Sequence, residues 1–342
     1  MSSLTAKSLN ILLLAGGVGG AKAAEGLVQG QADHKVSILG NIADDQEFHG
    51  LWVSPDIDTL TYSLADAIDR QQGWGLKNES HRILNRLADL GADTWMSLGD
   101  LDIATHIYRT QARNAGESAT SIASAIAQSF GVKTPILLPT NDVVQTQVET
   151  PNGWLSFQEY FVKERCQPEV KAIRFEGIEQ AQPTAEALAA IAGADVIVFA
   201  PSNPVVSISP ILNIPGIRDA IEQSQARKIA ISPFIAGKTV KGPADKMMAS
   251  AGVDEGLVGV AQLYQGLIDD LVIDTKDVAL SDTIKYYGYQ VLVTNTLMTT
   301  ADDKNALMSD VVDFATSQLS ASHPDTARFD TVPLATSMLE AG

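Results

Sequence analysis

Short apolar runs alternate with amphipathic stretches along most of the chain. Residues 11–15 form a continuous apolar run of strand length, and residues 21–29 follow it with helical spacing. The same pattern predicts further strands at residues 36–39, 135–138, 194–200 and 228–232, and helices at residues 59–70 and 118–130. This strand–helix–strand order favours a parallel α/β sheet.

The pattern changes between residues 141 and 190. Residues 145–150 and 154–162 have β-like composition, and the turn triplet Pro151-Asn152-Gly153 between them predicts a hairpin. We therefore expect an α/β fold with a Rossmann-like, doubly wound and mostly parallel sheet over residues 1–140 and 191–318. Residues 141–190 would form a smaller β-containing insertion, and residues 319–342 a C-terminal tail without a strong element.

The charge balance limits the partners. The 342 residues carry 24 basic and 41 acidic side chains, a formal net charge of −17. Nonspecific binding to nucleic acid or to an anionic membrane needs basic patches, so neither partner is expected. The single cysteine, Cys166, excludes an internal disulfide. The early apolar run is too short to span a membrane and lacks a cleavable-signal pattern, so we expect a soluble, cytoplasmic protein.

A glycine-rich segment, residues 15–22 (AGGVGGAK), separates the first predicted strand from the first helix. Glycines let the backbone approach a phosphate, and the N–H groups of a helix N-terminus attract its charge. The segment lacks the Gly-Lys-Ser/Thr of a P-loop and the third glycine of the dinucleotide fingerprint. It predicts phosphate binding rather than nicotinamide binding, with a tight turn and no ligand as the alternative.

Four acidic residues follow the next predicted strand. Asp44 and Asp45 lie just past it, where ligands of open α/β sheets gather. If Asp56-Ile57-Asp58 is extended, both carboxylates point to one side and suit a hard cation such as Mg²⁺. The alternative is that Asp58 only caps a helix beginning near Thr59.

Polar groups also follow other predicted elements. Asp100 and Asp102 either serve a ligand or lie in the first turn of a helix, and His106 is interpreted as a structural histidine. Ser202-Asn203 and Lys238 follow two further strands. Together these turns place several hydrogen-bond donors at strand C-termini, which is typical of a ligand site.

The motifs together resemble the CofD/FbiA family of phospholactyl transferases, which act in the biosynthesis of the deazaflavin coenzyme F420. The matching strings occur in the family's order over roughly residues 9 to 315: GGVGGAK at 16–22, NIADD at 41–45, SPDIDT at 54–59, GWG at 73–75, LGDLD at 98–102, ATH at 104–106, FQ at 157–158, PSNPVVSI at 201–208, SPFIAGK at 232–238 and NTLMT at 295–299.

The resemblance implies a reaction. The donor would be a guanosine-diphosphate-activated acid (lactyl, enolpyruvyl or glyceryl), and the acceptor the terminal ribityl hydroxyl of Fo, 7,8-didemethyl-8-hydroxy-5-deazariboflavin. GMP would leave and a phosphodiester would remain. Family members use Mg²⁺ and are usually dimeric, so Mg²⁺ and a homodimer are expected.

The resemblance also implies roles for single residues. Asp58 and Asp44 would be catalytic, and Asp44, Asp45 and Asp58 would hold the metal. The expected substrate-binding residues are Gly17, Gly19, Gly20, Lys22, Asp56, Ser97, Asp100, Ser202, Asn203 and Lys238. Trp154 or Phe157 would wall the flat deazaflavin, with a place in the core as the alternative.

Two positions depart from the family pattern. Leu101 stands where the family often has arginine in Gly-Asp-Arg-Asp, and Ser97 aligns with a position that is often basic in archaeal members. Both departures remove positive charge, which puts donor or acceptor contacts near them in doubt. Two other functions are weighed against the transferase. One is a non-enzymatic nucleotide-sugar-binding regulator of related fold. The other is a nicotinamide oxidoreductase.

Overall fold

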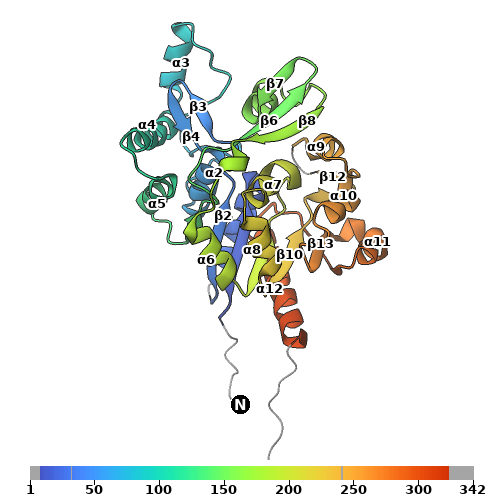
Figure 1. Ribbon diagram of the computed structural model, residues 1–342. Coiled ribbons are helices and arrows are strands. Elements are labelled where there is room, and N and C mark those ends of the chain that lie inside the picture. The colour runs from blue at the N-terminus through green and yellow to red at the C-terminus, as the bar shows by residue number, and fades with distance from the viewer. Residues whose placement is uncertain (1–7, 32, 240–241, 323–342) are drawn as a thin grey trace, which may run out of the picture.

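A seven-stranded sheet forms the centre of the protein, and every neighbouring pair in it runs parallel (Figure 1). The computed structural model describes residues 8–31, 33–239 and 242–322. In spatial order the strands are β14 (Gln290–Thr294), β13 (Asp270–Asp274), β10 (Arg227–Ile231), β9 (Val196–Phe199), β1 (Asn10–Ala15), β2 (Lys35–Gly40) and β5 (Ile136–Leu137). The predicted Rossmann-like, doubly wound α/β fold is confirmed.

The strand β1 lies inside the sheet and is apolar on both faces. Leu12, Leu13 and Leu14 are at most 1% exposed. Continuous apolar runs of this kind are typical of parallel strands that helices cover on both sides. Ile11 of β1 pairs with Val36 of β2 on one side and with Val196 of β9 on the other. The two neighbours of β1 thus come from different parts of the sequence.

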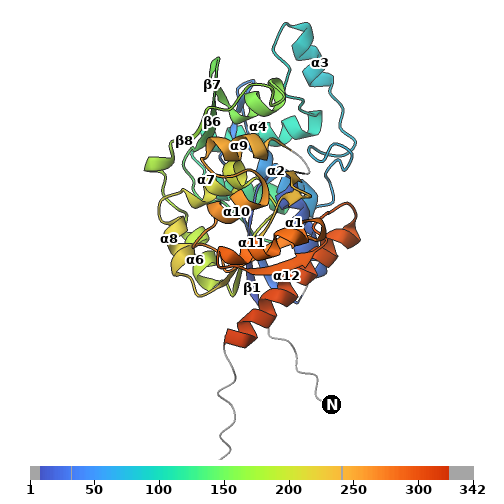
Figure 2. The ribbon, with the colours of Figure 1, turned by 90° about the vertical axis from the view of Figure 1, so that its right-hand side faces the viewer.

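Helices cover both faces of the sheet. Figure 2 shows α1 and α12 on one side of it and α6 and α8 on the other. The helices are α1 (Gly17–Gly30), α2 (Pro55–Leu64), α3 (Arg82–Asp89), α4 (Asp100–Asn114), α5 (Ala119–Ser129), α6 (Ala185–Gly193), α7 (Ser209–Leu212), α8 (Ile217–Gln223), α9 (Ala244–Ser250), α10 (Gly256–Leu263), α11 (Ser281–Tyr286) and α12 (Ala301–Ser322).

Small antiparallel sheets surround the core. They are β3 (Gln46–Phe48) with β4 (Leu51–Val53), β11 (Phe234–Ile235) with β12 (Lys238–Thr239), and the three strands β7 (Gly153–Ser156), β6 (Gln145–Thr150) and β8 (Ala172–Glu176). Short π-helices span Glu159–Lys163 and Pro204–Ile208, and 3₁₀-helices span Ile178–Gln180 and Thr275–Leu280. The three-stranded sheet lies within residues 141–190, and Figure 1 shows it at the same end of the molecule as β3 and β4.

The helix predicted at residues 59–70 is displaced. It begins at Pro55, whose fixed φ suits the first helical position, and it ends at Leu64. Asp66 adopts a positive φ of 51°, and its N–H bonds back to Ser63 O. A left-handed residue after the last turn ends a helix even where the apolar spacing continues.

The second run of the predicted hairpin is shorter than expected. Residues 145–150 form β6 as predicted, but β7 ends at Ser156 and a π-helix follows. Ser156 Oγ accepts the N–H of Glu159, and Glu159 Oε2 accepts the N–H of Ser156. This reciprocal pair is a capping box, a strong start signal for a helix. The prediction of a strand through residue 162 is therefore wrong.

The helix α12 packs along α1. A Cβ on Gly26 would lie 2.3 Å from Lys304 O, so glycine is needed for this approach. Glu25, only 2% exposed, pairs with Lys304 of α12 and, at 3.0 Å, with Arg70. The helix extends through residue 322, past the boundary expected at 318, and residues 323–342 of the predicted tail lie outside the described residues.

Candidate active site

The loops after β1 and β9 meet at the carboxyl edge of the sheet. Strand order reverses here, because the chain continues from β1 to β2 on one side and later adds β9 on the other. Ligands of open α/β sheets bind at such a point. Ser202 Oγ donates to Gly16 O at 2.7 Å, and a Cβ on Gly19 would lie 2.3 Å from Pro201 O. Glycine at position 19 therefore lets α1 begin against the β9 loop.

A cavity of about 770 Å³ opens beside these loops, a volume in the range of small-molecule sites. Its wall contains residues from the β1, β2 and β9 loops, the start of α2 and the segment before α4. The predicted site residues among them are Gly17, Gly19, Lys22, Asp44, Asp56, Asp58, Ser97, Ser202 and Asn203. The structure thus brings the glycine loop and the carboxylates into one cavity. Their binding roles stay predictions.

Four predicted site residues are not part of the cavity wall. Gly20 packs α1 on β1, since a Cβ there would lie 2.9 Å from the Cβ of Ala15. Asp45 is half-buried and lies outside the wall. Asp100 accepts the N–H of Ile83 and caps α3, and Lys238 is exposed on β12. Substrate contacts of these four residues stay predictions.

Burial makes it costly to ionise the carboxyl groups of Asp44, Asp45 and Asp56. It raises the pKa of Asp45 to about 7, against hydrogen bonds from Ser54 and the charge of Arg109. Burial also raises the pKa of Asp56 to about 6, although Asn41 Nδ2 donates to Asp56 Oδ2 at 2.9 Å. The pKa of Asp44 lies well above its ordinary value because of burial and the nearby charges of Asp56 and Asp45. A bound cation would offset this cost.

Asp56 and Asp58 do not lie on an extended segment. Both belong to the first turn of α2, where residues two apart point about 200° away from each other. The expectation that both carboxylates point to one side is therefore wrong. Asp56 faces Asn41, whereas Asp58 faces Arg109 and His106. Both residues nevertheless line the cavity.

Two of the three predicted metal ligands offer a carboxylate oxygen to a magnesium ion. The three do not form one cluster, because among the described residues only Asp58, Asp102 and His106 have ligand atoms within 4.8 Å of one another. Asp44 Oδ1 and Asp58 Oδ2 are buried oxygens without a hydrogen-bond partner among the described residues, and both side chains line the cavity. Carboxylate oxygens are the ligands that Mg²⁺ prefers. In the described part of the chain Asp45 Oδ1 also lacks a hydrogen-bond partner, but its other oxygen accepts from Ser54 Oγ at 2.7 Å and Trp52 Nε1 at 3.3 Å. Asp45 thus has the weaker structural support as a ligand.

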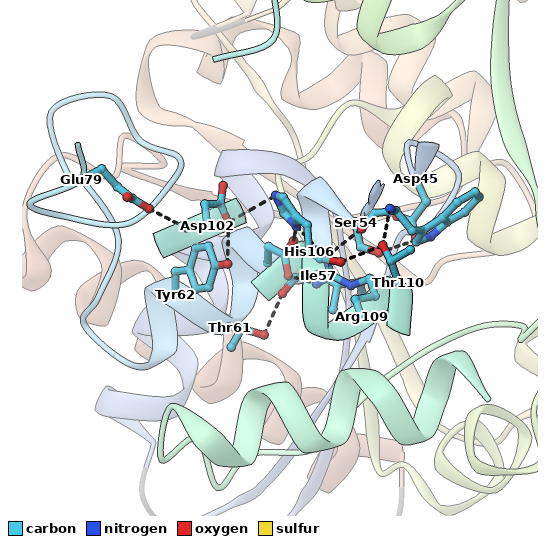
Figure 3. Close-up of polar contacts among 12 residues, drawn as sticks. Asp45, Ser54, Ile57, Thr61, Tyr62, Glu79, Asp102, His106, Arg109 and Thr110 are labelled. Atoms are coloured by element: carbon cyan, nitrogen blue, oxygen red, sulfur yellow. Dashed lines mark hydrogen bonds and ion pairs between the residues drawn. The ribbon is translucent and has the colours of Figure 1, made fainter. Parts of the chain in front are cut away.

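One face of α4 completes the wall. Figure 3 shows Asp102, His106 and Arg109 projecting from this helix toward Tyr62 and the start of α2. Tyr62 Oη donates to Asp102 Oδ1 at 2.7 Å, and His106 Nε2 lies 3.5 Å from the same oxygen. Although desolvation opposes it, contact with His106 holds the pKa of Asp102 below its ordinary value. Asp102 and His106 both border the cavity, but His106 is 0% exposed, so its interpretation as a structural histidine stays a prediction.

Sequence reasoning did not single out Arg109. The side chain is 4% exposed and pairs with Asp58. A signal was present, because residues 102, 106 and 109 have the i, i+4, i+7 spacing of one helix face. An arginine on a face that also carries an acid and a histidine indicates a buried polar network rather than a solvated surface.

Aromatic side chains form the outer wall. Trp74, Phe157 and Phe161 line the cavity, and the rings of Phe157 and Phe161 stack with centroids 5.5 Å apart. Trp154 does not line it and instead lies 4.3 Å from the guanidinium carbon of Arg174. Of the two residues predicted to wall a flat ligand, only Phe157 borders the cavity. It is 8% exposed and also belongs to the core, so both interpretations of Phe157 stay open. Trp74 and Phe161 were missed as wall residues.

The fold and the cavity define a class. This is a parallel α/β protein whose glycine loop, buried carboxylates and aromatic wall enclose one site at the strand C-termini. Residues 11–317 match the family described as 2-phospho-L-lactate transferase CofD. The chain belongs to this family of transferases, which act in coenzyme F420 biosynthesis.

Curated relatives cover almost the whole chain. A phosphoenolpyruvate transferase of Streptomyces griseus is 38% identical over 90% of this chain and 98% of its own. A 2-phospho-L-lactate transferase of Methanosarcina mazei is 33% identical over 88% of this chain and 99% of its own. The relatives thus differ in the acid that their names specify.

A solved structure supports the fold alone. Protein BH3568 of Bacillus halodurans superposes with a TM-score of 0.60 at 19% identity, covering 90% of this chain and 100% of that one. In the part of the chain that the structure describes, no helix has the length and apolar character needed to cross a membrane.

Proposed function

We propose that the protein transfers a phospholactyl, phosphoenolpyruvyl or phosphoglyceryl group from a GDP-activated donor to the terminal ribityl hydroxyl of Fo, in the cytoplasm and as a homodimer. One observation carries the proposal beyond the family. Two carboxylate oxygens that have no hydrogen-bond partner among the described residues, Asp44 Oδ1 and Asp58 Oδ2, belong to side chains that share a cavity with a phosphate-type glycine loop. A diphosphate, a divalent cation and a hydroxyl acceptor can meet there.

The bond changes are those of a phosphoryl-group displacement. The Fo hydroxyl oxygen forms a bond to the phosphorus that bears the acid. The bond from that phosphorus to the bridging diphosphate oxygen breaks, and GMP leaves with the electron pair. The hydroxyl proton passes to Asp58 or to solvent, and the product is a phosphodiester. Positioning and charge neutralisation dominate such reactions because the protein forms no covalent bond.

Different residues of the cavity would bind different parts of the donor. Gly17, Gly19 and the N-terminus of α1 offer backbone N–H groups to the diphosphate. Lys22, also in the wall, donates to Met298 O at 2.8 Å and ties the segment 296–299 to the phosphate side. Ser202 and Asn203 would contact the guanosine side.

Asp44 and Asp58 would hold Mg²⁺, which, when bound, neutralises charge that develops on the phosphate oxygens. Asp58 would also orient the acceptor hydroxyl, since its Oδ2 has no hydrogen-bond partner among the described residues. Phe157 and Phe161 stack with an angle of 18° between their rings and offer a nearly flat aromatic surface to the deazaflavin.

Mass spectrometry tests the proposal. Purified protein is incubated with Fo, Mg²⁺ and the three guanosine-diphosphate-activated acids in competition. A phosphodiester product with an equivalent of GMP supports the transferase and shows which acid is preferred. Nucleotide binding without product would support the regulator instead. Sedimentation of the same preparation tests the homodimer.

A further inference from the structure

Arg109 is the most deeply buried cation beside the proposed acceptor site. It lies on α4, whose Thr110 Oγ1 accepts the N–H of Trp52 at 2.8 Å and so joins the helix to β4. The guanidinium donates to Asp58 Oδ1, to His106 Nδ1 at 2.9 Å and to Trp52 O at 3.4 Å. Figure 3 shows Arg109 and His106 side by side on the face that meets α2.

These contacts fix the proton on His106. A guanidinium only donates, so the Nδ1 that it contacts must accept, and the ring proton is on Nε2. That nitrogen faces Asp102 Oδ1 at 3.5 Å. The hydrogen bond therefore runs from Arg109 to His106, the contact of His106 with Asp102 is a longer one, and Arg109 also holds one oxygen of Asp58.

The guanidinium of Arg109 lies beside a cluster of side chains that would otherwise attract a metal cation. Ligand atoms of Asp58, Asp102 and His106 lie within 4.8 Å of one another, a spacing that would suit a metal ion. Arg109 already supplies a positive charge to this cluster and uses the His106 nitrogen nearer to Asp58, whose Oδ2 lies 3.8 Å away. A fixed planar cation of this kind orients a carboxylate more rigidly than a lysine does.

We propose that Arg109 is a positioning residue that holds Asp58 by Oδ1 from the buried side and leaves Oδ2 directed at the reacting groups. The proposal rests on the proposed function, because it assigns Asp58 to the acceptor hydroxyl. It predicts that Arg109 affects turnover rather than substrate affinity. It also predicts that Arg109 weakens cation binding, since its own charge repels a cation held by Asp58.

The test compares three variants. Arg109→Met removes the charge and the hydrogen bonds, and Arg109→Lys keeps the charge but loses the fork. Arg113→Met is the matched control. It makes the same change one turn along α4, where Arg113 lies 4.0 Å from the Trp52 ring and does not line the cavity. Each variant is measured for kcat, for KM of Fo and of the donor, for Mn²⁺ affinity by calorimetry, and for thermal unfolding.

For Arg109→Met we expect kcat to fall about a hundredfold, with both KM values within about threefold of the parent. Arg109→Met should bind Mn²⁺ more tightly than the parent does, although its turnover is lower. Arg109→Lys should lower kcat about tenfold at unchanged KM. Arg113→Met should match the parent. A merely structural role would weaken turnover, Mn²⁺ binding and folding together.

The proposal is overturned if folded Arg109→Met keeps kcat within about threefold of the parent, or if its Mn²⁺ affinity falls with kcat. If Arg109→Met does not fold, Arg109→Lys decides, and an unchanged kcat in that variant overturns the proposal. A parent protein without turnover would contradict the proposed function instead. The Mn²⁺ affinities would then test the proposed role of Arg109 by themselves. Tighter binding in Arg109→Met would support that role, and weaker binding would overturn it.

Discussion

At the scale of single residues, the cavity depends on carboxylates that the fold buries at a cost. Asp58 keeps one oxygen on Arg109 and leaves the other without a hydrogen-bond partner among the described residues. Asp58→Asn keeps the shape and removes the charge. We expect turnover to fall at least about a hundredfold while the variant stays folded at 25 °C.

Steady-state rates and thermal melts of Asp58→Asn check this expectation. Asp282→Asn is the control, since its side chain is 96% exposed on α11. Equal activity in Asp58→Asn and the parent would remove Asp58 from the mechanism.

The raised pKa of Asp45 predicts a pH dependence of stability. Burial raises this pKa to about 7, so the folded protein holds a proton that the unfolded chain releases near pH 4. The contribution to stability is complete below that lower pKa and is lost as the pH rises through 7. The melting temperature of chelator-treated protein should therefore fall between pH 5 and pH 8.

Asp45→Asn should reduce this slope, because it removes the titrating group and keeps an acceptor for Ser54. Melting curves of parent and variant at several pH values, all in chelator, provide the measurement. An identical slope in both proteins would show that Asp45 does not carry the effect.

At the scale of elements, the contact between α1 and the β9 loop is the critical fit. A Cβ on Gly19 would lie 2.3 Å from a backbone oxygen, which cannot move aside as a flexible side chain can. Gly19→Ala should cost about 1–3 kcal/mol of unfolding free energy and weaken nucleotide binding. Urea unfolding and calorimetry with GDP measure the two effects.

Gly193→Ala is the matched control at the end of α6. Nothing lies within 4 Å of a Cβ at this position, and the residue is helical. Alanine there should be neutral or stabilise by up to about 1 kcal/mol. If Gly19→Ala and Gly193→Ala lost similar amounts of unfolding free energy, the close approach at Gly19 would not be what destabilises the first variant.

The elements also show how far sequence reasoning reaches. The buried strands β1, β2, β9 and β10 were predicted within two residues at each end, because an apolar run between polar turns is a local signal. The end of α2 and the short β7 were not, since a left-handed Asp66 and a capping box override spacing and composition. Arg109 was missed because its partner Asp58 lies 51 residues away, and only the fold joins them.

At the scale of the whole molecule, a chain with a formal net charge of −17 concentrates four buried acids, Asp44, Asp56, Asp58 and Asp102, in the wall of one cavity. Their mutual repulsion favours a bound divalent cation. Treatment with EDTA should therefore abolish turnover, and Mg²⁺ in excess should restore it. Full activity in EDTA, measured by GMP release, would contradict the magnesium assignment.

The pairing of β1 with β9 has a consequence for how the protein is made. Gly16 and Ser202, which hydrogen-bond across this seam, are 186 residues apart. During synthesis, β1 and β2 leave the ribosome early, yet one edge of β1 has no partner until most of the chain has followed. Non-local pairing of this kind is slow to form. The half of the molecule with β1, β2 and β5 therefore has an open, apolar edge until then, and the cavity exists only after the second half docks.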